Sequence, residues 1–87
     1  MKLTRSAVYA ILDTERQYQE AKFPQGNTLG ESVALFNKYI ARLNATYTKS
    51  PGGTEASMEI IRKLGGIAVR AMEENGATAR TPFGTAR

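Results

Sequence analysis

Residues 29–47, LGESVALFNKYIARLNATY, contain the clearest periodic pattern in the chain and decide its fold. Six large apolar residues recur there at intervals of four, three, four, three and four: Leu29, Val33, Phe36, Ile40, Leu43 and Tyr47. This spacing places them on one face of an α-helix. Thr28 and Glu31 have the spacing of a capping box, which predicts that the helix begins at about residue 29.

Two further helices are predicted, one on each side of this stretch. Residues 4–22 begin with Thr4 as an N-cap and end before Pro24, because the residue preceding a proline is disfavoured in a helix. Residues 55–75 follow the loop KSPGG and end at Gly76. The pattern predicts an all-α, up-down-up three-helix bundle over residues 1–76, followed by an irregular tail at 77–87.

Two adjacent glycines, Gly65 and Gly66, interrupt the third predicted helix. Each costs a helix about 1 kcal/mol relative to alanine, so the pair needs a compensating reason. Close approach of another helix supplies one, and a kink or a ligand cleft is the alternative. The positions of this helix that are predicted to face inward are Ile60, Ile61, Leu64, Ile67, Ala68, Ala71 and Met72.

The composition indicates that the chain has limited stability and excludes several classes of function. A single domain of 87 residues buries only about 60% of its unfolded surface, so self-association into a homo-oligomer is expected to support it. The sequence contains no cysteine and no histidine, which excludes disulfides, thiolate or imidazole zinc sites and histidine-dependent nucleophilic catalysis. Any catalysis would have to come from carboxylates with a hard metal ion, or from lysine or tyrosine. Because the acidic residues match no known carboxylate motif, we expect no metal, no cofactor and no catalytic residues.

The formal net charge of +4 favours an anionic partner. Basic residues are spread along the chain and mixed with acidic ones, so nucleic acid is not the expected partner. No stretch approaches the ~20 apolar residues of a membrane span, and no secretion signal is visible. We expect a cytoplasmic protein that does not bind membranes.

A polar stretch, ERQYQE at residues 15–20, continues the first helix beyond its apolar half. At helical spacing Val8 and Leu12 share a stripe with Glu15 and Gln19, so a face that begins apolar becomes polar. One interpretation is structural, with Glu15 paired to Arg62 or Arg70 of the third helix. The other is that this face lines a ligand site.

Much of the chain resembles a set of small proteins found in phages and prophages. Their pattern is Glu-Arg-x-Tyr-Gln-x-x-Lys-aromatic, a helix that starts Ser-Val, then Arg-Lys and Met-Glu-x-x-Gly-Ala-x-x-Arg. The matching residues are Glu15, Arg16, Tyr18, Gln19, Lys22, Phe23, Ser32, Val33, Arg62, Lys63, Met72, Glu73, Gly76, Ala77 and Arg80. The chain departs from the pattern at Phe23, where tryptophan is usual, and at Asn75, where histidine is usual. The resemblance implies a phage origin, and the set has no established activity.

These observations predict a phage-encoded, non-enzymatic binding protein. Its most specific form is an oligomeric sponge that sequesters an anionic, nucleotide-type signal of host immunity. The residues predicted to bind the ligand are Arg16, Lys22 and Arg80 for phosphates, Tyr18 or Phe83 for stacking on a base, and Gln19 beside them. One alternative is an inhibitor that binds a host protein. Another is a magnesium-dependent nucleotide pyrophosphohydrolase of the MazG type, although the acidic residues lack the spacing of that motif.

Overall fold

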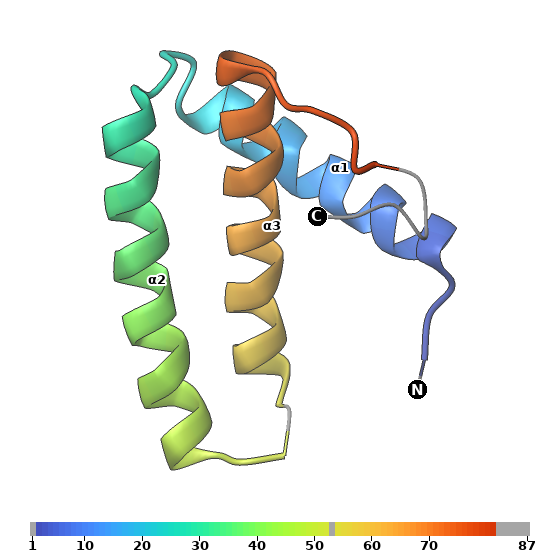
Figure 1. The fold of residues 1–87 in the computed structure, drawn as a ribbon. Coiled ribbons are helices and arrows are strands. Elements are labelled where there is room, and N and C mark those ends of the chain that lie inside the picture. Colours follow the sequence, from blue (N-terminus) through green and yellow to red (C-terminus); the bar gives the residue numbers. More distant parts are fainter. Residues whose placement is uncertain (1, 53, 82–87) are drawn as a thin grey trace.

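The computed structural model describes residues 2–52 and 54–81 of the 87-residue chain. It contains three α-helices: α1 (Arg5–Lys22), α2 (Leu29–Lys49) and α3 (Glu55–Asn75) (Figure 1). The described residues include no β-strand, and the predicted all-α, three-helix fold is confirmed. The helix bounds lie within two residues of the predicted ones, and the largest difference is that α2 continues two residues further.

Local side-chain chemistry fixes the helix ends. The Glu31 backbone N–H donates to the Thr28 hydroxyl (3.1 Å), and the Thr28 N–H donates to the Glu31 carboxylate (2.7 Å), which is the predicted capping box. Thr4 and Thr54 cap α1 and α3 with their hydroxyl oxygens. After α3, Gly76 has a φ of +83°, a conformation that favours glycine.

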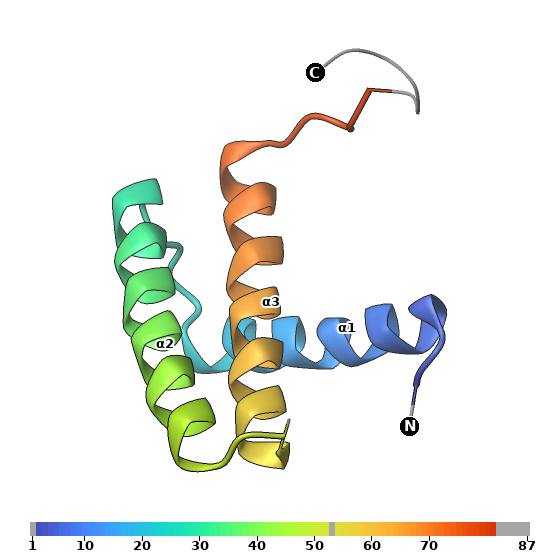
Figure 2. The ribbon, with the colours of Figure 1, turned by 60° about the horizontal axis from the view of Figure 1, so that its bottom comes forward.

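The helix α3 is the centre of the molecule, because it packs against both α1 and α2. α2 and α3 run antiparallel, side by side, as a helical hairpin (Figure 1). α1 lies across α3, and its first half extends past the hairpin (Figure 2). The bundle is therefore open, with α1 crossing the hairpin instead of lying parallel to it.

The contact between α1 and α3 is made at the glycine pair. A Cβ atom on Gly66 would lie 2.7 Å from Cγ of Glu15 and 2.7 Å from Nε2 of Gln19, and one on Gly65 would meet Leu12. A larger residue at Gly66 would collide with two buried side chains of α1, and one at Gly65 would displace the end of Leu12, so the predicted close approach is confirmed. This packing offsets the poor helix propensity of the two glycines.

The interior of the chain is small and polar. Among the described residues only two hydrophobic side chains are buried, those of Ile60 and Ile67 (8% and 7% exposed). The buried polar or charged side chains are those of Glu15, Gln19, Ser32, Ser57 and Arg70. Polar groups therefore make up much of the fully buried interior, and the fully buried apolar core is small.

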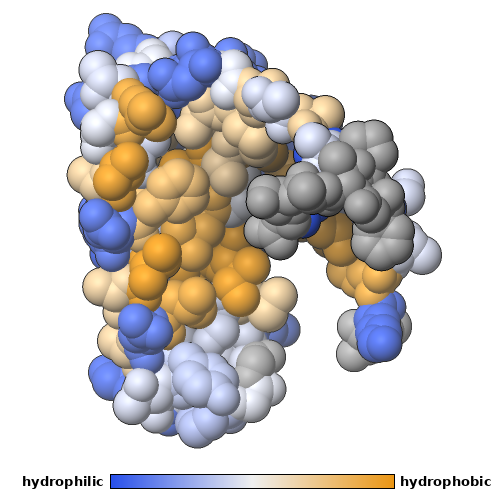
Figure 3. Space-filling model, viewed as in Figure 1, coloured by the Kyte–Doolittle hydropathy of each residue, from blue (hydrophilic) through white to orange (hydrophobic). Residues whose placement is uncertain are grey.

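Several side chains that the sequence pattern places inward are exposed. On α3, Ile61 and Met72 are 43% and 49% exposed. On α2 the exposed members of the apolar stripe are Leu29, Val33, Ile40 and Tyr47. The reason is geometric: α1 and α2 cover two sides of α3, and one flank of the α2–α3 hairpin stays uncovered. Hydrophobic side chains gather on that flank (Figure 3).

Candidate functional site

The polar half of α1 faces α3 and forms a buried network there. Arg62 Nε donates to Glu15 Oε1 at 2.9 Å, so the predicted pairing of Glu15 with Arg62 is confirmed. Gln19 Nε2 donates to Glu15 Oε2 (2.9 Å) and to the backbone carbonyl of Lys63 (3.3 Å). Glu15 and Gln19 are only 6% and 8% exposed, so these bonds stabilise the α1–α3 contact and fix its register.

Replacing Glu15 with glutamine is expected to lower the free energy of unfolding by about 1 to 3 kcal/mol. The substitution removes the charge that pairs with Arg62, and it replaces one of the two acceptor oxygens with an NH2 group that cannot accept from Gln19. Urea unfolding followed by circular dichroism measures the change. Glu20→Gln is the matched control, since its side chain is 71% exposed and its ion pair with Arg16 is 3.7 Å long. Equal effects of the two substitutions would show that the buried network contributes nothing beyond a surface ion pair.

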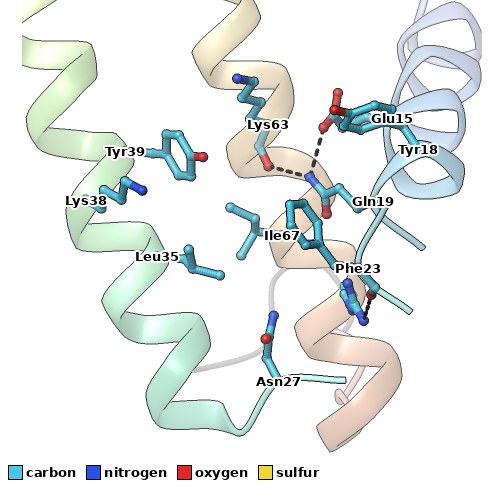
Figure 4. Close-up of a pocket in the computed structure, with 11 residues that line it drawn as sticks. Glu15, Tyr18, Gln19, Phe23, Asn27, Leu35, Lys38, Tyr39, Lys63 and Ile67 are labelled. Carbon is cyan, nitrogen blue, oxygen red and sulfur yellow. Dashed lines mark hydrogen bonds between the residues drawn. The ribbon is translucent and has the colours of Figure 1, made fainter. Parts of the chain in front are cut away.

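A groove of about 410 Å³ lies beside this network, between the end of α1 and the first half of α2, with α3 as its floor. This α1–α2 groove is lined by Glu15, Tyr18, Gln19, Phe23, Asn27, Leu35, Lys38, Tyr39, Lys63, Ile67 and Arg70. Side chains from all three helices point toward it (Figure 4). Its volume is in the range of small-molecule sites, and its lining mixes aromatic, aliphatic and basic groups.

Three cations gather around one aromatic ring at this groove. The centroid of the Tyr39 ring lies 5.5 Å from Lys38 Nζ, 5.2 Å from Arg42 Cζ and 5.7 Å from Lys63 Nζ. Within the described part of the chain none of the three forms an ion pair. The ring offsets part of their mutual repulsion, and an anion in the groove would offset more of it.

The edge of the groove is held in place by Arg70, whose side chain is buried (5% exposed). Its Nη2 donates to the backbone carbonyls of Phe23 (2.7 Å) and Gln25 (2.6 Å). Its Nε lies 3.4 Å from Glu74 Oε2, and the other carboxylate oxygen of Glu74 accepts from the Asn27 N–H (3.3 Å). Arg70 therefore has a structural role, because its hydrogen bonds attach the loop between α1 and α2 to α3.

The structure brings together two of the six residues predicted to bind a ligand. Tyr18 and Gln19 both line the α1–α2 groove, although the Gln19 amide is already bonded to Glu15 and Lys63. Arg16 Nη2 pairs with Glu73 Oε1 at 2.6 Å on the other side of α1. The other three predicted residues are Lys22 and Arg80, which are exposed and do not line the groove, and Phe83, which lies outside the described residues.

The sequence-based prediction missed Lys38, Tyr39 and Lys63 as candidate binding residues. A signal for part of this group is present in α2, where Glu31, Lys38, Arg42 and Lys49 are separated by seven, four and seven residues. Such spacing places all the charged side chains of α2 on one face. The spacing within α2 does not predict that Lys63, which belongs to α3, lies near the Tyr39 ring.

Within residues 2–52 and 54–81 no cluster of acidic side chains is suited to hold a metal ion, and no helix is long and apolar enough to cross a membrane. The phage origin implied by the resemblance stays a prediction. Comparison with protein-family models, curated proteins and solved structures finds no match to this chain.

Proposed function

We propose that this protein is a non-enzymatic binding protein that captures an anionic ligand of nucleotide type in the α1–α2 groove. The observation that supports this most directly is the gathering of Lys38, Arg42 and Lys63 around Tyr39. Side-chain cations that lack carboxylate partners are the groups that bind phosphates in other proteins. The positive net charge of the chain would also raise the rate at which an anion arrives.

A nucleotide suits this groove better than a simple inorganic anion does. Tyr18 and Phe23 line it from the α1 side and are 56% and 57% exposed, so their rings are available for a base to stack on. Lys38 and Lys63 approach from α2 and α3. An elongated ligand with an aromatic end and an anionic end would satisfy both sides of the groove.

The biological form of the proposal is a phage-encoded sponge that sequesters a nucleotide signal of host immunity. It is supported by the resemblance to small phage proteins and by the groove, where the described residues offer recognition groups rather than an evident reactive group. Binding without turnover is sufficient for such a task. Arg16, Lys22 and Arg80 take no part in this version of the proposal, because they do not line the groove.

A thermal-shift titration with ADP in the absence of magnesium tests the proposal, with adenosine and inorganic phosphate as partial ligands. ADP at 100 times its Kd should stabilise the fold by about 2.7 kcal/mol, whereas each partial ligand should bind more weakly. Lys38→Gln and Lys63→Gln should each weaken ADP binding about tenfold, since each removes one charge-assisted hydrogen bond. Lys49→Gln is the control, because Lys49 lies on the same face of α2 but outside the groove.

The same titration separates the alternatives. Release of phosphate or pyrophosphate that requires magnesium would point to a pyrophosphohydrolase and would overturn the sponge. The absence of any response to ADP and to related nucleotides would overturn anion capture and favour an inhibitor that binds a host protein.

A further inference from the structure

We propose that the uncovered flank of the α2–α3 hairpin is the docking surface for a second copy of this chain. This apolar face consists of Leu29, Val33, Phe36, Ile40, Leu43 and Tyr47 on α2 and of Met58, Ile61 and Met72 on α3. Helical spacing puts the α2 members on one stripe, and most members of the face are exposed. Hydrophobic side chains gather on the side of the hairpin shown in Figure 3, and the α1–α2 groove opens on the opposite side (Figure 4). The proposal does not depend on the identity of any ligand in the groove.

The balance between buried and exposed hydrophobic residues supports this assignment. Among the described residues only Ile60 and Ile67 are buried hydrophobic residues, whereas most of the large side chains of the apolar face are exposed. Covering this face would remove apolar surface from water and add to the small interior of the chain.

The area of the apolar face is close to that of a standard dimer interface. Seven of its side chains are between 43% and 57% exposed: Leu29, Val33, Ile40, Tyr47, Met58, Ile61 and Met72. At half exposure a large side chain presents on the order of 100 Å², so these seven present roughly 700 Å². A standard interface buries about 800 Å² on each partner, and contact with the rim of the face would supply the difference.

The distribution of charge permits a second copy as the occupant. Helical spacing places all four charged residues of α2 on the flank away from the apolar face. Most charged residues of α3 likewise lie away from it; Glu73 lies next to Met72 in the adjoining groove between α1 and α3, where it pairs with Arg16. Two copies with a net charge of +4 each repel one another, and a neutral face lets them meet with their charges directed outward. A strongly charged partner would find no complementary group on this face.

A second copy also fits the geometry of the hairpin. Two antiparallel helices that present one flat apolar flank can pair with the same flank of a two-fold-related hairpin to form a four-helix bundle. Ile40 lies at the middle of the α2 stripe and is therefore expected near the centre of the interface. A second, largely apolar groove of about 450 Å³ lies between α1 and α3, next to the edge of the apolar face. Met72 lines this groove as well, so the face continues toward Tyr9 and Leu12.

Light scattering of the parent chain and of Ile40→Glu tests the proposal. The parent should have twice the mass of the 9.5 kDa chain at micromolar concentrations, and Ile40→Glu should shift it toward the single-chain mass. Ile11→Glu is the matched control, because Ile11 is 40% exposed, compared with 47% for Ile40, but lies on α1 outside the face. A parent with the single-chain mass would overturn the proposal and would leave the face to a different protein or to a lipid surface. An assembly that Ile40→Glu leaves intact would also overturn it.

A second variant keeps the test decisive if Ile40→Glu does not fold. The chain contains no cysteine, so Ile40→Cys introduces a single thiol with little change in polarity. A short bismaleimide should link two copies of Ile40→Cys and should leave Ile11→Cys mostly unlinked. Equal cross-linking of the two variants would contradict the proposed interface.

Discussion

Replacing Gly66 with leucine is expected to separate α1 from α3 and to lower the free energy of unfolding by roughly 3 to 5 kcal/mol. A Cβ at this position would already lie 2.7 Å from both Glu15 Cγ and Gln19 Nε2. These two side chains are buried and hydrogen-bonded to each other, so they cannot move aside without breaking the network that includes Arg62. A loss of this size is a large fraction of the roughly 5 to 15 kcal/mol by which native domains are stable.

Gly30→Leu is the matched control for this experiment. Gly30 lies in the first turn of α2, where the nearest atom to an added Cβ is the Thr28 hydroxyl at 3.9 Å. Because leucine has a higher helix propensity than glycine, this variant should be as stable as the parent or slightly more stable. Urea unfolding of both variants gives the comparison. A Gly66→Leu protein with parental stability would show that α1 does not pack closely on α3.

Replacing Arg70 with methionine should have the next largest effect, a loss of about 2 to 4 kcal/mol. The substitution keeps an apolar stem of similar length but removes the donors to the carbonyls of Phe23 and Gln25. It also leaves Glu74 with one partner fewer, although the Asn27 N–H still donates to that carboxylate. The loop between α1 and α2 should therefore loosen.

Hydrogen exchange at the amides of residues 23–28 is the measurement that separates this local effect from a general loss of stability. In Arg70→Met these amides should exchange faster, while those in the middle of α2 change much less. Arg5→Met is the control, because Arg5 is exposed in the first turn of α1. If the loop amides are as protected in Arg70→Met as in the parent, Arg70 does not hold the loop.

The helices could be predicted from the sequence because their signals are local. The capping box at Thr28 and Glu31 needs only neighbouring residues, and the stripe from Leu29 to Tyr47 needs only helical periodicity. The pair at Gly65 and Gly66 indicated close approach because its cost in helix propensity required an explanation.

The site could be predicted only in part, because it depends on how the helices cross. Arg16 pairs with Glu73, which is 57 residues away in the sequence, and nothing local distinguishes it from an arginine that is free to bind an anion. Lys63 reaches the Tyr39 ring of another helix only because α2 and α3 are antiparallel. The exposure of Ile61 has the same kind of cause, since the crossing of α1 leaves one flank of α3 uncovered.

An NMR titration of the labelled protein with ADP shows whether the α1–α2 groove binds an anionic nucleotide. We expect the backbone amide signals of Tyr18, Lys38, Tyr39 and Lys63 to shift together and to saturate with one Kd. The same titration of Lys63→Gln should need about ten times more ADP. The side-chain Nε–H signal of Arg16, which bonds to Glu73, and the backbone amide signal of Arg80 should stay in place. Shifts confined to Arg16, Lys22 and Arg80, or no shifts at all, would contradict the assignment of the groove as the binding site.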